Sequence, residues 1–248
     1  MRRALCLLLC WVCAAGAQSA ALGLYNEGNS HYRDGDFAAA QRAYQRAADS
    51  GVEDARLFYN LANAHFKLGE LGEAIVWYER AHRLDPRDED IAANLRFAHQ
   101  VKKDRDPDAE GNAVSQFFTS TFFHPTLSEL SLVFAAGWIG LFVLGSWRVW
   151  FRRSSSLWLA GLLACGAVAA LAGGWLGARA YQQAGEVSAI VVADVVTARS
   201  GPDMGQTEVF IMHEGTKVRV VRRESDWMLV RLQNGLGGWV RVAAIRAI

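Results

Sequence analysis

Two long uncharged apolar runs, joined by a short basic loop, dominate the middle of this chain. Residues Leu130 to Trp147 and Ser154 to Ala178 contain no charged side chain, and three arginines lie in the connecting segment 148–153. Each run is long enough to cross a bilayer core of about 30 Å at about 1.5 Å per residue. A soluble helical hairpin would need a polar face, which neither run has. We therefore predict two transmembrane helices in the lipid bilayer, at residues 127–147 and 154–178.

The basic loop and the N-terminus predict the same orientation. Short loops rich in arginine stay in the cytoplasm, so the loop 148–153 is expected inside and both flanking segments outside. Residues 1–17 have the pattern of a secretory signal peptide, with Arg2 and Arg3 before an apolar stretch and Ala15-Gly16-Ala17 as the cleavage site. An uncleaved anchor is the alternative. The four cysteines lie in this signal and in the second apolar run, so the exported segments offer no disulfide and no cysteine-based metal site.

The first exported segment, residues 21–101, matches itself after a shift of 34 residues. Tyr25 aligns with Tyr59 and Tyr44 with Tyr78, without a gap. A period of 34 with small residues at helix crossings is the signature of tetratricopeptide helix pairs. The second copy resembles that family closely, at Leu61-Ala62, Lys67-Leu68-Gly69, Glu73-Ala74, Tyr78 and Asp85-Pro86. We expect about two repeats and a capping helix after Pro86, followed by a linker over residues 102–126.

Asparagines recur at two registers of these repeats, three residues apart, which in the tetratricopeptide fold face the concave groove. An amide both donates and accepts hydrogen bonds, which suits an extended peptide or a terminal carboxylate. The alternative is that the asparagines bond neighbouring helices and bind nothing. The candidate peptide-binding residues are Asn26, Asn29, Asn60, Asn63 and Asn94, with Arg33 and Lys67 as candidate cations.

Three histidines also stand 34 residues apart, at His31, His65 and His99. A row of imidazoles could hold a metal, but no thiol or carboxylate accompanies them at ligand spacing. Partly buried structural histidines are the simpler interpretation, and we predict no metal and no cofactor.

The second exported segment, residues 186–248, changes to the period of two that is typical of half-buried strands. Met228, Val230 and Leu232 alternate with other residues, and Asn234-Gly235 indicates a type I′ hairpin. The segment resembles bacterial SH3-like domains, from Val195 to Pro202 and around Gly238-Trp239-Val240. That resemblance implies a small β-barrel that binds cell-wall peptides or proteins through an aromatic groove. Trp227 and Trp239 are the groove candidates, and core packing is the alternative for Trp239.

No phosphate loop, nucleophile elbow or paired metal-ligand motif occurs in the sequence, so we expect a scaffold and not an enzyme. Residues 21–110 hold 12 Lys and Arg against 17 Asp and Glu, a net charge of −5, which disfavours nucleic acid as a partner. The expected fold class is therefore multidomain α + β: a tetratricopeptide solenoid, a two-helix transmembrane hairpin and a small SH3-like β-barrel.

This order of modules resembles the BatE-type proteins of bacterial aerotolerance operons. The resemblance implies a bacterial inner-membrane protein with both soluble modules on the extracytoplasmic side. It also implies a role in oxidative-stress tolerance, with von Willebrand A-domain membrane proteins and, indirectly, a MoxR-type ATPase as partners. The alternative function is a peptidoglycan-binding module that localises or activates a cell-wall hydrolase.

Overall fold

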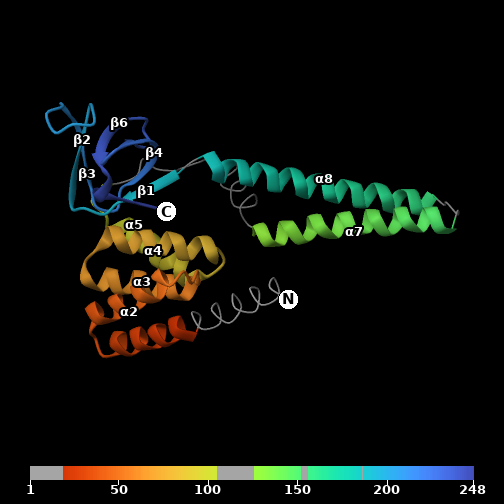
Figure 1. The fold of residues 1–248 in the computed structure, drawn as a ribbon, viewed down its shortest axis with the longest axis horizontal. Coiled ribbons are helices and arrows are strands. Elements are labelled where there is room, and N and C mark those ends of the chain that lie inside the picture. Colours follow the sequence, from red (N-terminus) through yellow and green to blue (C-terminus); the bar gives the residue numbers. More distant parts are fainter. Residues whose placement is uncertain (1–18, 105–125, 152–155, 186) are drawn as a thin grey trace, which may run out of the picture. The chain divides into compact units, whose positions relative to one another are not determined.

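The structure, a computed structural model, describes residues 19–104, 126–151, 156–185 and 187–248 (Figure 1). The chain forms two compact units: residues 1–109 together with residues 187–248, and residues 110–186. The predicted signal peptide (1–17), most of the predicted linker (102–126) and the end of the predicted loop (148–153) lie outside the described residues.

The N-terminal part of the first unit is a stack of helices. A helix over residues 19–33 is followed by α2 (Phe37–Asp49), α3 (Ala55–Leu68), α4 (Leu71–Leu84) and α5 (Glu89–Val101). Carboxylates of Asp36, Asp54 and Asp88 accept hydrogen bonds from backbone N–H groups in the first turns of α2, α3 and α5. Gly69, at φ 81°, ends α3 in the left-handed conformation that glycine adopts most easily. These caps divide the segment into antiparallel helix pairs.

Small side chains allow these helices to approach each other closely. Three small residues of the second repeat, Ala62, Ala74 and Ala81, are fully buried. They pack with the large buried rings of Tyr44 and Tyr78 in one core. The sequence repeat therefore reflects a repeated packing arrangement.

The C-terminal segment forms one antiparallel sheet of seven strands. The strands are β1 (Val187–Val191), β2 (Val195–Arg199), β3 (Glu208–His213), β4 (Lys217–Glu224), β5 (Trp227–Arg231), β6 (Gly237–Arg241) and β7 (Ile245–Ala247), with a 3-10 turn at Val242–Ala244. Their order is β3-β2-β6-β5-β4-β1-β7, which leaves β3 and β7 as edges. The predicted closed barrel is therefore wrong, because closure would require the two edge strands to pair.

The hairpin between β5 and β6 also differs from the prediction. A type I′ turn needs a positive φ at both central residues. Gly235 has φ 89°, but among the described non-glycine residues only Ser225 has a positive φ. Gly235 N–H instead donates to the carbonyl of Leu232 at 3.0 Å, in a longer connection. The position of the turn was predicted correctly and its type was not.

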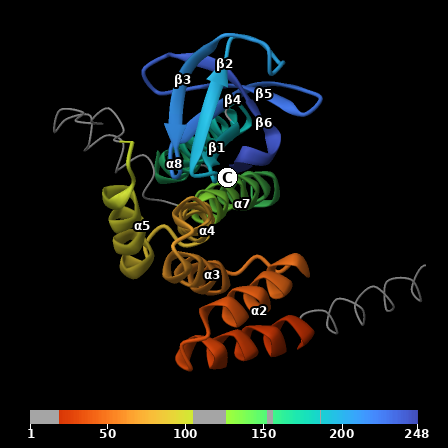
Figure 2. The ribbon, with the colours of Figure 1, turned by 90° about the vertical axis from the view of Figure 1, so that its left-hand side faces the viewer.

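The sheet packs directly on the helical stack, an arrangement that the sequence did not indicate (Figure 2). Ile190 of β1 is fully buried and belongs to the core of the helices. A Cβ atom on Gly72 of α4 would lie 2.5 Å from the carbonyl oxygen of Val191, so only glycine fits there. The helices and the sheet therefore share one core and fold as one body.

The second unit contains two long apolar helices, α7 (Leu127–Phe151) and α8 (Ser156–Gly185). Both are long and apolar enough to span a membrane, and in each the most apolar window is only 11% buried. A core helix of a soluble protein would be mostly buried. Glycines of α7 face α8: a Cβ atom on Gly137 would lie 3.0 Å from Ala169, and one on Gly140 would lie 2.6 Å from Cys165 Sγ. This low burial favours an apolar surrounding for the pair.

Candidate functional site

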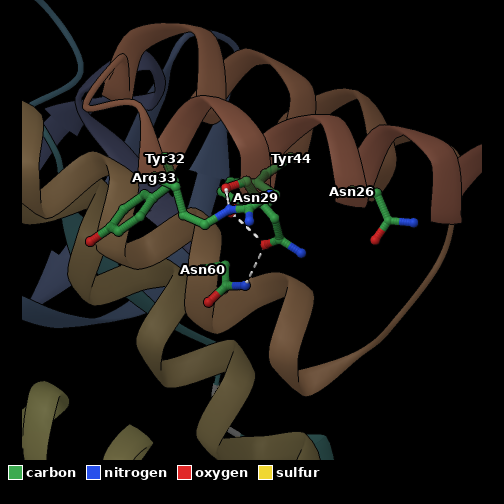
Figure 3. A pocket seen from close by; sticks show the side chains of 6 residues that line it. All are labelled: Asn26, Asn29, Tyr32, Arg33, Tyr44 and Asn60. Carbon is green, nitrogen blue, oxygen red and sulfur yellow. Dashed lines mark hydrogen bonds between the residues drawn. The ribbon is translucent and has the colours of Figure 1, made fainter.

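Tyrosines and asparagines form a hydrogen-bond network between the first three helices (Figure 3). Asn29 Oδ1 accepts from Tyr44 Oη at 2.8 Å and from Asn60 Nδ2 at 3.1 Å. The same Asn60 Nδ2 donates to Tyr25 Oη at 3.1 Å. The amide of Asn60 thus joins α3 to the helix over residues 19–33, and Asn29 joins that helix to α2.

The same network recurs one repeat later. Asn63 Oδ1 accepts from Tyr78 Oη and, at 3.1 Å, from Asn94 Nδ2. Asn94 Nδ2 also donates to Tyr59 Oη at 2.9 Å. The asparagine register therefore connects neighbouring helices, which was the alternative to peptide binding in the sequence analysis.

Burial fixes the protonation of this network. Burial, followed by the nearby phenols of other tyrosines, raises the pKa of Tyr44 and Tyr78 well above the ordinary value. Both hydroxyls thus remain protonated and donate to the asparagine oxygens. Gly28 makes room for the first of these rings, since a Cβ atom there would lie 2.5 Å from Tyr44 Cδ1.

A pocket of about 570 Å³ opens on the first network. Its lining contains two amide atoms that have no hydrogen-bond partner among the described residues, Asn29 Nδ2 and Asn60 Oδ1. Neither atom is among the buried unsatisfied ones, so both reach solvent. One is a donor and the other an acceptor, which is the pair that an extended peptide backbone needs. The pocket is lined by Asn26, Asn29, Tyr32, Arg33, Tyr44 and Asn60.

The structure brings only some of the predicted groove residues together. Asn26 lines the pocket but lies apart from the network in Figure 3. Arg33 also lines it, and its Nε donates to the carbonyl of Asn29 at 3.2 Å. Lys67 is exposed and does not line this pocket. Asn63 and Asn94 belong to the second network, outside the pocket lining.

The two tryptophans of the sheet are largely buried. Trp227 and Trp239 are 8% and 7% exposed. Each carries a guanidinium over its ring, from Arg241 at 4.9 Å and from Arg222 at 5.1 Å. Their role as walls of an aromatic groove remains a prediction.

The histidine row does not converge on one point. His31, His65 and His99 each approach a different glutamate: Glu27 at 4.0 Å, Glu70 at 2.6 Å and Glu79 at 3.7 Å. Among the described residues, no group of three metal-ligating side chains occurs.

Polar contacts across the boundary between helices and sheet were missed by sequence reasoning. Lys217 Nζ lies 2.9 Å from Glu79 Oε1, and Arg246 Nε lies 3.1 Å from Glu73 Oε1. Asp104 accepts from the backbone N–H of His213 and the hydroxyl of Thr216, both at 2.7 Å. Carboxylates of the helical segment thus meet donors and cations of the sheet.

These contacts shift two carboxyl groups toward the charged form. Burial alone would raise the pKa of Glu79, but His99 and the ammonium of Lys217 outweigh it and lower the pKa to about 2. Burial would also raise the pKa of Asp104. The hydrogen bonds that its carboxylate accepts from His213 and Thr216 outweigh the effect of burial, so the pKa is lowered. Both carboxylates therefore stabilise the contact when charged.

Comparison with known proteins identifies the helical segment. The tetratricopeptide repeat family model matches residues 25–89. This chain contains tetratricopeptide repeats. Among solved structures, the chain is similar to the first tetratricopeptide domain of Spaghetti (RPAP3) bound to the HSP90 peptide SRMEEVD. That match has 22% identity and a TM-score of 0.21, and it covers 34% of this chain and 93% of that one. No curated protein matches the chain.

Proposed function

We propose that this protein is a membrane-anchored, non-enzymatic scaffold that holds partner polypeptides outside the cytoplasm. Tetratricopeptide arrays bind other proteins and carry no catalytic machinery of their own. The observation that carries the proposal is the pocket on the Tyr–Asn network, where Asn29 Nδ2 and Asn60 Oδ1 remain available. An extended segment of a partner would place its own carbonyl and N–H groups against these two atoms.

The anchor in this proposal is the helical hairpin of α7 and α8. The segments before and after it pack into one core, through Ile190 and the ion pairs to Glu73 and Glu79. Two segments that share a core must lie on the same side of a membrane. An even number of spans between them supports this layout, and the arginines of the loop 148–153 favour the extracytoplasmic side for both.

The wider context of the proposal rests on the order of modules. Tetratricopeptide repeats, a membrane hairpin and a C-terminal SH3-like module together resemble BatE-type proteins. We extend the proposal to an inner-membrane complex with von Willebrand A-domain proteins, connected to a MoxR-type ATPase and to oxidative-stress tolerance.

The groove is tested by site-specific photocrosslinking of the full chain in bacterial membranes. A photoreactive residue at Asn26, which lines the pocket, should capture a discrete polypeptide, and the same residue at Arg42, outside the pocket lining, should not. Equal capture at the two positions, or none at either, contradicts a peptide-binding groove.

Repeat symmetry supplies a matched pair of variants for the same assay. Asn60→Ala and Asn94→Ala each remove an amide with equivalent bonds between helices, but only Asn60 lines the pocket. We expect Asn60→Ala to reduce capture about tenfold, the cost of one lost hydrogen-bond partner, and Asn94→Ala to leave it near wild type. If both variants lost capture equally, and their melting temperatures fell equally, the asparagines would be purely structural.

A further inference from the structure

One face of the sheet carries a group of arginines on strands β4, β5 and β6. Residues directly opposite each other in an antiparallel ladder project to the same face. Arg219 pairs with Arg231, Arg222 with Leu229, and Trp227 with Arg241. Because alternate residues of β5 share a face, all these side chains lie together. We call Arg219, Arg222, Arg231 and Arg241 the arginine face.

Cations outnumber acids on this surface. Arg222 pairs with Glu224 at 2.8 Å, in an ion pair whose side chains are both more than half exposed. Within the part of the chain that the structure describes, Arg231 and Arg241 make no ion pair. Arg231 and Arg241 therefore offer two exposed guanidinium groups to an anionic ligand.

Two of these guanidinium groups lie over the rings of tryptophans. Arg222 lies 5.1 Å from the ring centre of Trp239, and Arg241 lies 4.9 Å from that of Trp227. A guanidinium stacked on an aromatic ring keeps its N–H donors in the plane of the group, where they can bind carboxylates in pairs. The tryptophans, 7% and 8% exposed, serve as the support of these donors.

The same face already binds carboxylates within this molecule. Ile190 pairs with both Lys217 and Arg246, so these three residues share a face, and Lys217 shares it with Arg219 two residues later. Ile190 enters the helical core, while Lys217 and Arg246 bind Glu79 and Glu73 of α4. Helix α4 thus covers the β1–β7 side of the face and presents Glu73 and Glu79 to it. The arginine face continues that contact onto β4, β5 and β6.

We propose that the arginine face binds an acidic polypeptide segment of a protein partner. The contact to α4 provides the precedent, since glutamates on a helix meet basic side chains of this sheet face. A polypeptide is favoured over a membrane surface because the anions that this sheet face binds in the structure are the side-chain carboxylates of Glu73 and Glu79. The site is separate from the groove of the repeats. It rests on the proposed scaffold function in one respect, namely that its partner is a protein.

The test is binding of a fluorescent oligoglutamate peptide to the full chain in neutral nanodiscs, followed by anisotropy. Wild type should bind, with affinity that falls steeply as salt rises. Arg231→Glu should weaken binding about tenfold or more, because it removes a charged hydrogen-bond donor and adds repulsion. Arg42→Glu makes the same charge change on α2 and should leave binding within about twofold. Equal effects of the two substitutions, or no binding by wild type, would overturn the proposal.

Two further measurements distinguish the arginine face from the repeat groove and from a general affinity for polyanions. Tighter Arg231-dependent binding to anionic phosphatidylglycerol vesicles or to oligothymidylate than to oligoglutamate would overturn the assignment to a polypeptide. Asn60→Ala, which acts on the repeat groove, should leave oligoglutamate binding unchanged. Loss of binding in Asn60→Ala would place the peptide in the groove, and the arginine face would then have no assigned role.

Discussion

At the scale of single residues, the repeat register predicted positions better than roles. Asn29, Asn60 and Asn94 were recognised because a shift of 34 residues preserves them. Whether an asparagine amide binds a ligand or a neighbouring helix depends on the tyrosines that lie opposite it. These tyrosines also recur with the period of 34 residues. Tyr25 and Tyr44 could have indicated the network, since buried hydroxyls need partners. Trp239 was equally ambiguous, because the arginine that lies over its ring, Arg222, comes from another strand.

Gly28 gives the sharpest prediction at this scale. Gly28→Ala would place a methyl group 2.5 Å from the ring of Tyr44, which is fully packed in the core. Overpacking of this kind typically costs about 1–3 kcal/mol, so the melting temperature of the full chain should fall by several degrees. The control is Gly23→Ala in the same helix, where nothing lies within 4 Å and alanine should stabilise by about 0.5–1 kcal/mol. Similar melting temperatures for the two variants would contradict the packing described here.

At the scale of elements, local sequence patterns predict where helices and strands form, but not which elements pack or pair with each other. The two apolar helices were predicted from composition alone, and the residues at their contact only in part. Small residues recur along the second run and predict a packing stripe, at Gly166, Ala170, Gly174 and Ala178, with Gly173 and Gly177 beside it. Cβ atoms on Gly173 and Gly166 would lie 2.9 Å from Phe134 and 3.9 Å from Leu141, but nothing lies within 4 Å of one on Gly174. Likewise the strands were indicated by alternation, while an open sheet differs from a barrel only in long-range pairing.

The contact between α7 and α8 can be captured covalently. A Cβ atom on Gly140 would lie 3.5 Å from Cys165 Cβ, within the separation that disulfides span. Gly140→Cys should therefore form a disulfide with Cys165 on mild oxidation in nanodiscs, detected by mass spectrometry of the intact chain. Gly145→Cys, with nothing within 4 Å of its Cβ, should remain reduced under the same conditions. Equal oxidation of both cysteines would mean that the helices do not pack in this register.

The contact of helices and sheet should respond to acid. Glu79 has a pKa of about 2 in the folded protein, against an ordinary value of 4.5. A lowered pKa stabilises the folded state above the ordinary value, and this stability is lost as the pH falls from about 4.5 toward 2. Thermal unfolding of wild type should therefore show a steeper loss of stability over this range than Glu79→Gln. Parallel pH profiles for the two proteins would show that the ion pair with Lys217 contributes nothing.

At the scale of the whole molecule, the sequence predicted the order of the modules but not the contact between the repeats and the sheet. Gly72 N–H donates to Glu214 Oε1 at 2.7 Å, across a separation of 142 residues. No periodicity in a sequence reports such a contact. Two exported modules were therefore predicted where the structure has one body, whose two segments are separated in sequence by the apolar helices α7 and α8.

The topology of that hairpin is tested with reporter fusions. A reporter that is active only outside the cytoplasm should work after Gln183 and fail at Ser155, because the loop arginines favour the cytoplasm. The same reporter at Lys103 should match the one at Gln183, since both flanking segments belong to one body. Activity at Ser155, or opposite results at Lys103 and Gln183, would contradict the layout.

The burial of Ile190 in the helical core has a consequence for how the protein is made. Ile190 is synthesised after both apolar helices, so the face of α4 that receives it stays open while α7 and α8 are being made. During that interval the repeats expose apolar surface, the state that chaperones and proteases recognise. A chain truncated after α8 would never leave this state. Completion of β1 therefore covers apolar surface of the repeats that every shorter chain leaves exposed.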